Sequence, residues 1–228
     1  MTAAGQRFAP QANPRPSYAQ ATRALLRERL LDAADDLLAS RDWATVTMAD
    51  IARGAGVSRQ TLYNEFGSRQ EFGQAYVLRE ADRFLTAAER AIAAHPDEPE
   101  AAVAAAFEGF FSTAPDSPLV RAIVTGDPGG GLLALVTTDS ARVLAPVTDR
   151  LAASLCATWP QLPGEQAHVA ADCAMRLAIS HALSPTGPAE LTARSVAALL
   201  GPYLEHAMAS GDGRREALPG ASAYGAGA

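Results

Sequence analysis

The sequence lacks the features that mark secreted, disulfide-stabilised and membrane proteins. It has only 2 cysteines among 228 residues, too few for the disulfide framework of a small secreted domain. No uninterrupted stretch approaches the roughly 20 apolar residues that cross a bilayer, and the first 17 residues contain no apolar segment typical of a secretory signal. We therefore expect a cytoplasmic protein, associated with the nucleoid if it binds DNA, with no membrane partner.

Lysine is also missing, so all 19 basic residues are arginines, and they are unevenly distributed. The formal net charge of −6 at pH 7 by itself disfavours binding to nucleic acid. Residues 1–80, however, carry 10 arginines and 9 acidic residues, whereas residues 81–228 carry 9 arginines and 16 acidic residues. The charge distribution is therefore compatible with a DNA contact in the first part of the chain.

Apolar residues make up 48% of the chain, which excludes wholesale disorder, and they recur mainly at helical spacing. The first helix carries one apolar stripe from Leu30 to Leu38. No stretch alternates in the manner of a half-buried strand, so the sequence predicts an all-α fold. Proline and glycine residues divide the later part into predicted helices at residues 68–94, 98–113, 117–125, 132–158 (broken near Asp139 or Pro146), 165–183 and 189–209.

Two short helices joined by a glycine-containing turn follow the first helix. Thr47 is the predicted cap of one helix, which ends near Gly54. Gly56 can adopt the positive φ of a tight turn, and Ser58 is the predicted cap of the second helix, residues 59–64. This arrangement is a helix-turn-helix, in which the second helix enters the major groove of DNA.

That second helix carries more hydrogen-bonding groups than so short a helix needs for solubility. Arginine pairs with guanine edges, glutamine and asparagine pair with adenine, and the threonine methyl group contacts thymine. Helix N-termini and nearby hydroxyl or guanidinium groups can hold phosphates, although the hydroxyl groups could serve only as caps and the tyrosine only as a surface aromatic. The predicted base-reading residues are Arg59, Gln60, Thr61 and Asn64, and the predicted phosphate contacts are Thr47, Ser58, Tyr63, Ser68 and Arg69.

The run TMADIARGAGVSRQTLYNEFGSRQEF resembles the N-terminal domain of the tetracycline-repressor (TetR) family of transcriptional regulators. The similarity extends from Leu30 to Tyr76. It implies a homodimer that places two recognition helices on a palindromic operator, and a C-terminal domain that binds an effector. One residue departs from the family pattern: the position before Phe66, often histidine in the family, is Glu65, which puts an acid near the expected DNA surface.

This resemblance and the chain composition divide the sequence into four segments. Residues 1–18 and 210–228 are expected to be disordered tails. Residues 19–67 are expected to form the DNA-binding domain, and residues 68–209 the helical ligand-binding and dimerisation domain. The family implies that the dimer forms through the final helix pair, within residues 165–209. An apolar stripe there is assigned to the dimer interface, with burial inside one subunit as the alternative: Val196, Leu200, Tyr203, Leu204 and Ala207.

The middle of the chain is apolar and has few charges, and its helices are interrupted by Pro115, Pro118 and Gly129–Gly131. Such helices are expected to pack imperfectly and leave a cavity for a long apolar effector, such as a fatty acid or an acyl-CoA, although a solid core is the alternative. Arg121 or Arg176 could meet a carboxylate at the cavity mouth. The candidate lining residues are Phe107, Phe110, Phe111, Leu119, Ile123, Leu144, Val147, Leu151, Met175 and Ile179.

No catalytic residue, cofactor or metal is expected. No serine or cysteine has histidine and aspartate partners in a motif context. The triple glycine lacks the strand and the lysine of a phosphate-binding loop, and His168 and Cys173 are poorly spaced for one metal ion. The sequence thus favours a ligand-responsive repressor, and the alternatives are a helical enzyme or a protein-binding adaptor that does not bind DNA.

Overall fold

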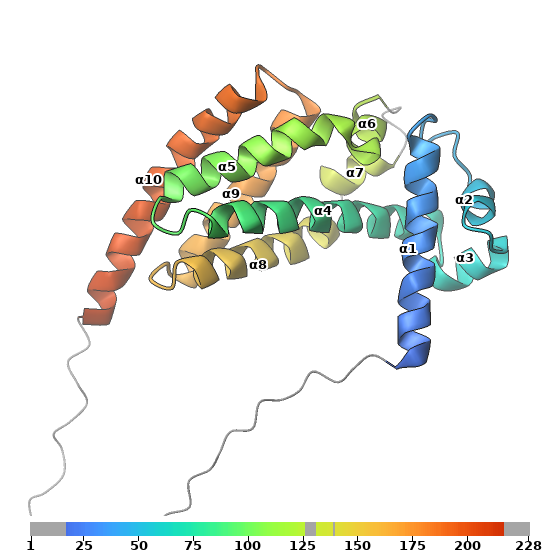
Figure 1. The fold of residues 1–228 in the computed structure, drawn as a ribbon, viewed down its shortest axis with the longest axis horizontal. Coiled ribbons are helices and arrows are strands. Elements are labelled where there is room, and N and C mark those ends of the chain that lie inside the picture. Colours follow the sequence, from blue (N-terminus) through green and yellow to red (C-terminus); the bar gives the residue numbers. More distant parts are fainter. Residues whose placement is uncertain (1–16, 126–130, 139, 217–228) are drawn as a thin grey trace, which may run out of the picture.

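The computed structural model describes residues 17–125, 131–138 and 140–216. Every regular element in these ranges is a helix, which confirms the predicted all-α fold (Figure 1). The helices are α1 (Tyr18–Leu38), α2 (Met48–Gly54), α3 (Arg59–Phe66), α4 (Arg69–Ala93), α5 (Pro99–Thr113), η1 (Ala114–Asp116), α6 (Pro118–Thr125), α7 (Leu132–Val136), α8 (Ala141–Thr158), α9 (Gly164–Leu183) and α10 (Ala189–Glu216).

The helix boundaries follow the predicted turns closely, with two differences. The predicted break within residues 132–158 lies between α7 and α8, and Pro146 lies inside α8. α10 continues to Glu216, past the expected end at residue 209, because a helix tolerates isolated glycines at about 1 kcal/mol each. The predicted tails fall mostly on residues 1–16 and 217–228, which lie outside the described residues, as do Gly129 and Gly130 of the predicted linker.

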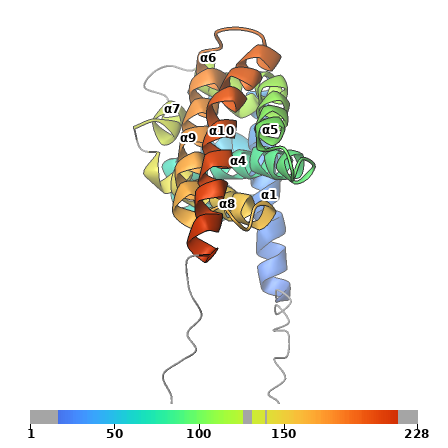
Figure 2. The same cartoon turned by 90° about the vertical axis from the view of Figure 1, so that its left-hand side faces the viewer.

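α4 connects the two parts of the molecule (Figure 1). α1 to α3 lie at its N-terminal end, whereas α5 and α8 run alongside it farther on. Figure 2 shows α9 and α10 side by side on the face of the molecule that is turned away from α2 and α3. None of the described helices is long and apolar enough to span a bilayer.

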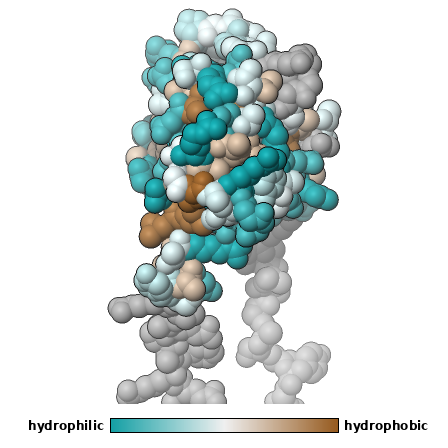
Figure 3. All heavy atoms as spheres, turned by 90° about the vertical axis from the view of Figure 1, so that its right-hand side faces the viewer, coloured by the Kyte–Doolittle hydropathy of each residue, from teal (hydrophilic) through white to brown (hydrophobic). Residues whose placement is uncertain are grey.

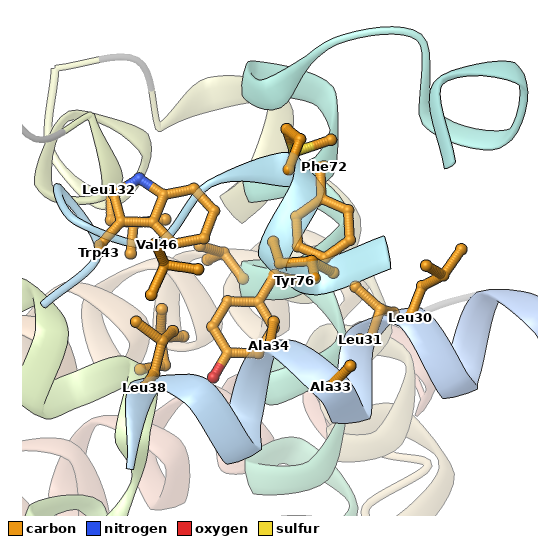
Figure 4. Close-up of a cluster of buried hydrophobic side chains, with 14 of the residues drawn as sticks. Leu30, Leu31, Ala33, Ala34, Leu38, Trp43, Val46, Phe72, Tyr76 and Leu132 are labelled. Carbon is orange, nitrogen blue, oxygen red and sulfur yellow. The ribbon is translucent and has the colours of Figure 1, made fainter. Parts of the chain in front are cut away.

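One buried cluster holds the DNA-binding domain together and extends into the C-terminal domain. Leu30 of α1, Leu62 of α3 and Phe72 of α4 are fully buried in it. Leu132 of α7 belongs to the same cluster, which Figure 4 shows over α1. Trp43 fills the space beside α4, with its ring stacked on Phe72 at a centroid distance of 6.4 Å. The two domains therefore share packed side chains as well as a helix.

α10 packs along α5, and this contact corrects the assignment of the α10 stripe. Val196, Leu200 and Leu204 are 3%, 6% and 1% exposed, and they lie in a second buried cluster of the C-terminal domain. Gly201 permits the close approach, because a Cβ atom at this position would lie 2.7 Å from the Cβ of Glu100. The stripe that the sequence assigned to a dimer interface is covered within the subunit.

Candidate DNA-binding surface and ligand cavity

The recognition helix α3 is anchored by apolar side chains and presents polar ones to solvent. Leu62 is fully buried and Phe66 is 5% exposed. Arg59, Gln60 and Asn64 are exposed, and the side of the molecule that carries α2 and α3 is predominantly hydrophilic (Figure 3). The structure thus places three of the four predicted base-reading residues on the surface of one helix.

Hydrogen bonds one helical turn apart orient these exposed side chains. Gln60 Nε2 donates to Asn64 Oδ1 at 2.8 Å. Arg59 Nη2 donates to the Tyr63 hydroxyl at 3.5 Å, and the guanidinium lies 5.2 Å from the centre of the tyrosine ring. Binding to a base edge would exchange these intrahelical partners for the donors and acceptors of the base.

The fourth predicted base reader, Thr61, is half-buried beside the cap of α3. Ser58 Oγ accepts a hydrogen bond from the Thr61 N–H at 3.0 Å and lies 2.8 Å from Thr61 Oγ1. Ser68 caps α4 in the same way, since its Oγ accepts from the Glu71 N–H at 3.1 Å. Ser58 and Ser68 are therefore helix caps, and their phosphate contacts remain predictions that are compatible with capping.

Thr47 caps α2 through a reciprocal pair of hydrogen bonds with Asp50. The Asp50 N–H donates to Thr47 Oγ1, and the Thr47 N–H donates to Asp50 Oδ2, both at 3.1 Å. The bonds from the Thr47 side chain and backbone, with the charge of Arg41, outweigh desolvation and lower the pKa of Asp50 to about 2. The ionised carboxylate stabilises the start of α2.

Arg69 has an intramolecular role that the sequence did not indicate. Its two terminal nitrogens donate to the carbonyl oxygens of Trp43 and Val46, both at 2.5 Å. Its guanidinium also lies 4.2 Å from the ring centre of Trp43. Arg69 thus fastens the α1–α2 connection to the first turn of α4, and we expect this internal role rather than the phosphate contact predicted from the sequence.

Glu65, the residue that departs from the family pattern, is bound by two arginines of α1. Arg23 Nε donates to Glu65 Oε2 at 2.8 Å, and Arg27 Nη1 donates to Oε1 at 2.8 Å. Burial raises the pKa of Glu65, but the hydrogen bonds and charges of Arg27 and Arg23 lower it by more. The sequence identified Glu65 as a departure from the family pattern but did not indicate its partners, which lie about 40 residues earlier in the chain.

A polar cluster connects α1 to α4 within the protein. Tyr76 donates its hydroxyl proton to Asp35 of α1, and Arg79 Nη2 donates to Asp35 Oδ2 at 2.5 Å. Glu80 is 5% exposed and accepts from Arg83 Nη1 at 2.7 Å. Burial raises the pKa of Glu80, as does the charge of Asp35, and together they outweigh the two arginines and a hydrogen bond from Ser117.

The polar cluster also reaches the helix that forms one wall of the C-terminal cavity. Ser117, which directly precedes α6, donates its hydroxyl proton to Glu80 Oε2 at 3.4 Å. Leu119, Val120 and Ile123 of α6 line the cavity. A displacement of α6 would therefore act on Glu80 of α4, and through the arginines on α1.

The C-terminal domain contains a cavity of about 170 Å³ whose lining residues are all apolar. α4 contributes Val77, Ala81, Phe84, Leu85, Ala88 and Ile92 to the wall, and helices from α5 to α10 supply the rest. The existence of the cavity favours the sequence prediction over a solid core. The lining includes these predicted residues: Phe107, Phe110, Leu119, Ile123, Leu144, Leu151, Met175 and Ile179.

Two predicted lining residues, Phe111 and Val147, are not among the residues that line this cavity, and their contact with a ligand stays a prediction. Phe111 packs against Phe107 and Phe110, and its ring meets that of His181. Val147 is 6% exposed within the second buried cluster. Both belong to the solid core next to the cavity, because helical spacing identifies an apolar face without indicating which side chains border a space.

The predicted arginines at the cavity mouth do not line the cavity either. Arg121 is exposed on α6. Arg176 Nε donates to Asp172 Oδ2 at 2.7 Å on the surface of α9. Among the residues that the structure describes, the cavity wall thus offers no charged partner to a ligand.

A capped helix-turn-helix with a polar recognition helix, joined by one helix to a separate helical domain, defines a DNA-binding transcriptional regulator. The chain belongs to the TetR family. Residues 30–76 match the family model described as bacterial regulatory proteins, tetR family, and residues 98–202 match the model of the bacterial tetracycline repressor C-terminal domain. Members of this family are transcriptional regulators, so the chain is not an enzyme.

Two relatives extend the similarity over most of the chain. The HTH-type transcriptional regulator AlkX of Mycobacterium tuberculosis is 40% identical over 188 residues, which cover 82% of this chain and 89% of the relative. The crystal structure of the TetR family repressor AlkX from Dietzia sp., implicated in biodegradation of n-alkanes, is 33% identical, with a TM-score of 0.71 and coverage of 90% of this chain and 100% of that one. The structure of RolR with resorcinol, at 20% identity and a TM-score of 0.55, shares the fold, with coverage of 89% of this chain and 99% of that one.

Proposed function

We propose that this regulator is a ligand-responsive repressor, which binds a palindromic operator as a homodimer and releases it when an apolar ligand enters the cavity. The observation that carries this proposal is the course of α4. Phe72 and Tyr76 lie in the core of the DNA-binding domain, and Val77 and Ala81, on the next turn, line the cavity. A ligand that displaces α4 would therefore move α3. Because its partner is chromosomal DNA, we expect the protein at the nucleoid in the cytoplasm.

The recognition helix would supply the sequence specificity. We assign base contacts to Arg59, Gln60, Thr61 and Asn64. The exposed amide and guanidinium groups match adenine and guanine edges, and the bonded hydroxyl of Thr61 leaves its methyl group for thymine. The backbone contacts would come from the starts of α2, α3 and α4, each of which presents free N–H groups next to a hydroxyl cap, with Tyr63 nearby.

The dimer would form through the outer sides of α9 and α10. Val169 of α9 is 45% exposed, and Leu191 and Leu199 of α10 are 58% and 62% exposed. Exposed large apolar side chains on two neighbouring helices are typical of a surface that is covered in an assembly. Pairing of this surface with its copy about a twofold axis would give an interface of four helices.

The cavity favours an effector that is mainly hydrocarbon. Its volume of about 170 Å³ is close to that of an engineered cavity of about 150 Å³ that binds benzene. A long alkyl or acyl chain is larger than benzene, so it must spread the helices that enclose the cavity. A ligand that prefers the spread conformation by about 1–3 kcal/mol or more would shift the protein away from DNA.

Fatty acids, acyl-CoA esters and n-alkanes all satisfy this requirement for a hydrocarbon chain. The relative from Dietzia sp. is implicated in biodegradation of n-alkanes, which supports an effector from hydrocarbon metabolism. Because none of the described residues that line the cavity is charged, we expect the carboxylate or CoA group of an acyl effector to lie outside it.

Selection of binding sequences from a random pool of DNA duplexes tests the repressor proposal. We expect a near-palindrome whose half-sites lie about one helical turn or slightly more apart. Binding to the selected duplex should weaken steeply with salt, because phosphate contacts release counterions. Enrichment of a sequence without twofold symmetry would contradict the homodimer, and the absence of enrichment would contradict specific recognition by α3.

A further inference from the structure

Glu65 occupies a position where an acid should oppose DNA binding. It is the second-to-last residue of α3, the helix that we expect in the major groove, between two rows of phosphates. An unpaired carboxylate there would repel the DNA backbone. The structure pairs Glu65 with Arg23 and Arg27, so the three side chains together carry a net positive charge.

The two arginines are bound to Glu65 in different ways. Arg27 donates to both the side chain and the backbone carbonyl of Glu65, and its guanidinium lies 4.4 Å from the ring centre of Phe66. Its side chain is 38% exposed. Arg27 therefore acts mainly to fasten α1 to the end of α3.

Arg23 is oriented by the same carboxylate but remains accessible. Only its Nε donates to Glu65, at 3.0 Å to Oε1 and 2.8 Å to Oε2. Its two terminal nitrogens make no hydrogen bond to the described residues, and its side chain is 63% exposed. The edge of the guanidinium that can bind two oxygen atoms at once is thus available to a partner outside the protein.

We propose that Glu65 is a positioning residue that aims Arg23 at a DNA phosphate beside the recognition helix. In the homeodomain, a three-helix variant of the helix-turn-helix, the C-terminal end of the recognition helix contacts the sugar-phosphate backbone. Arg23 lies on α1 and is tied through Glu65 to the C-terminal end of α3, so it reaches the backbone next to the groove in which α3 lies. Glu65 then improves a phosphate contact through Arg23, although its own charge is negative.

A double-mutant cycle tests this inference, which rests on DNA binding by α3. Arg23→Ala, Glu65→Ala and the double variant of the full chain are titrated, across a salt series, with the duplex of about 30 base pairs selected by the wild-type protein and with an unselected duplex of equal length. Wild-type binding in the same series checks DNA binding itself. Arg90→Ala, an exposed arginine at the far end of α4, is the matched control.

The inference predicts a specific pattern in this cycle. Arg23→Ala lowers the salt slope by about two, one for each subunit of the dimer, and weakens both duplexes by about sixtyfold at roughly 0.1 M salt, whereas Arg90→Ala leaves the slope unchanged. In the Glu65→Ala background the Arg23 substitution has less than about a twofold effect, because Arg23 is no longer oriented. Glu65→Gln, which keeps one acceptor oxygen, replaces Glu65→Ala if thermal unfolding shows that the latter is unfolded.

Two results would overturn the inference. An unchanged salt slope for Arg23→Ala would show that the arginine makes no phosphate contact and only links α1 to α3. An Arg23 effect that is as large without Glu65 as with it would show that Glu65 does not position the arginine.

Discussion

Some side chains of the DNA-binding surface expose their polar groups to solvent, whereas others cap helices through hydrogen bonds to the backbone. Arg59, Gln60 and Asn64 are exposed and bonded only within or along α3. The hydroxyl groups of Ser58 and Ser68 instead accept bonds from backbone N–H groups at helix starts. Substitution of the first group should therefore change which sequence is bound, whereas substitution of groups that face phosphates should change the affinity for every sequence.

Gln60→Ala should weaken binding to the selected duplex by about 1–3 kcal/mol for each half-site and relax the sequence preference at one base pair of each half-site. Tyr63→Phe, which removes only the hydroxyl group, should weaken selected and unselected duplexes to a similar extent. Competition binding against duplexes with single-base changes measures both effects. Equal losses on all sequences from both variants would refute the division into base and phosphate contacts.

Arg69→Ala should mainly reduce stability, because both of its terminal nitrogens are bonded inside the protein. The loss of charge-assisted hydrogen bonds to two carbonyl groups predicts a decrease in unfolding free energy of about 1–3 kcal/mol in chemical denaturation. The salt slope of DNA binding should stay unchanged. A slope lowered by about two, one for each subunit of the dimer, with full stability would instead support the phosphate contact predicted from the sequence.

The sequence predicted the kinds of residue on this surface better than their partners. Short-range patterns give the caps at Thr47, Ser58 and Ser68, because each cap involves residues only three apart. The bonds from Arg69 to Val46 and from Arg23 to Glu65 join residues that are 23 and 42 apart. Only the packing of α1, α3 and α4 determines such pairs, and no local pattern encodes it.

At the scale of elements, the sequence predicted where helices begin and end, but not which partner covers the apolar face of a helix. Proline and glycine mark most boundaries, since one cannot donate a backbone hydrogen bond and the other favours turns. An apolar stripe such as that of α10 shows only that something covers it. The same spacing from Val196 to Leu204 would suit a second subunit or α5, and the structure gives α5.

The polar cluster between α1, α4 and α6 predicts a pH dependence of stability. The raised pKa of Glu80 means that the native state binds this proton more tightly than the unfolded state does, whose pKa is about 4.3. Stability from this group is therefore fully present below about pH 4.3 and is lost as pH rises through the raised native pKa.

Glu80→Gln should remove this contribution, so the unfolding free energy of the variant relative to the wild type should increase as pH rises above about 4.3. Urea denaturation of both proteins at several pH values between about 4.5 and 8 measures the difference. A difference that does not change with pH would show that burial and Asp35 do not raise the native pKa of Glu80.

At the scale of the whole molecule, two domains share one helix and one buried cluster. Leu132 of α7 packs in the same cluster as Leu30 and Phe72, and Glu80 joins α6 to the arginines that bind α1. A change in the cavity therefore has two contiguous routes to the recognition helix, one apolar and one polar. In the proposed homodimer, either route would change the spacing of the two recognition helices.

Neighbouring residues of α10 distinguish the dimer surface from the subunit core. Leu199 is 62% exposed and Leu200 is 6% exposed. Leu199→Glu should keep the helical fold but convert the dimer to monomers, with loss of operator binding, because it places unpaired charge in the proposed interface. Leu200→Glu should instead destabilise the subunit by several kcal/mol. Sedimentation and circular dichroism separate the two effects, and a dimeric Leu199→Glu protein at micromolar concentration would refute this interface.

The central claim is that an apolar ligand in the cavity releases DNA through α4. Adjacent alanines of α4 provide a matched pair of variants: Ala88 lines the cavity, whereas Ala87 is exposed. Ala88→Phe should fill part of the cavity and block the ligand, and Ala87→Phe should behave like the wild type. Both variants should bind the selected duplex.

The most direct measurement is the fluorescence anisotropy of a labelled duplex in complex with each protein, during titration with fatty acids and n-alkanes of increasing chain length and with acyl-CoA esters. We expect long apolar chains to release DNA from the wild type and from Ala87→Phe, and Ala88→Phe to require at least about tenfold more ligand, a difference of about 1.4 kcal/mol. Release by a small polar metabolite and by none of these chains, or an Ala88→Phe response equal to that of the wild type, would contradict the claim.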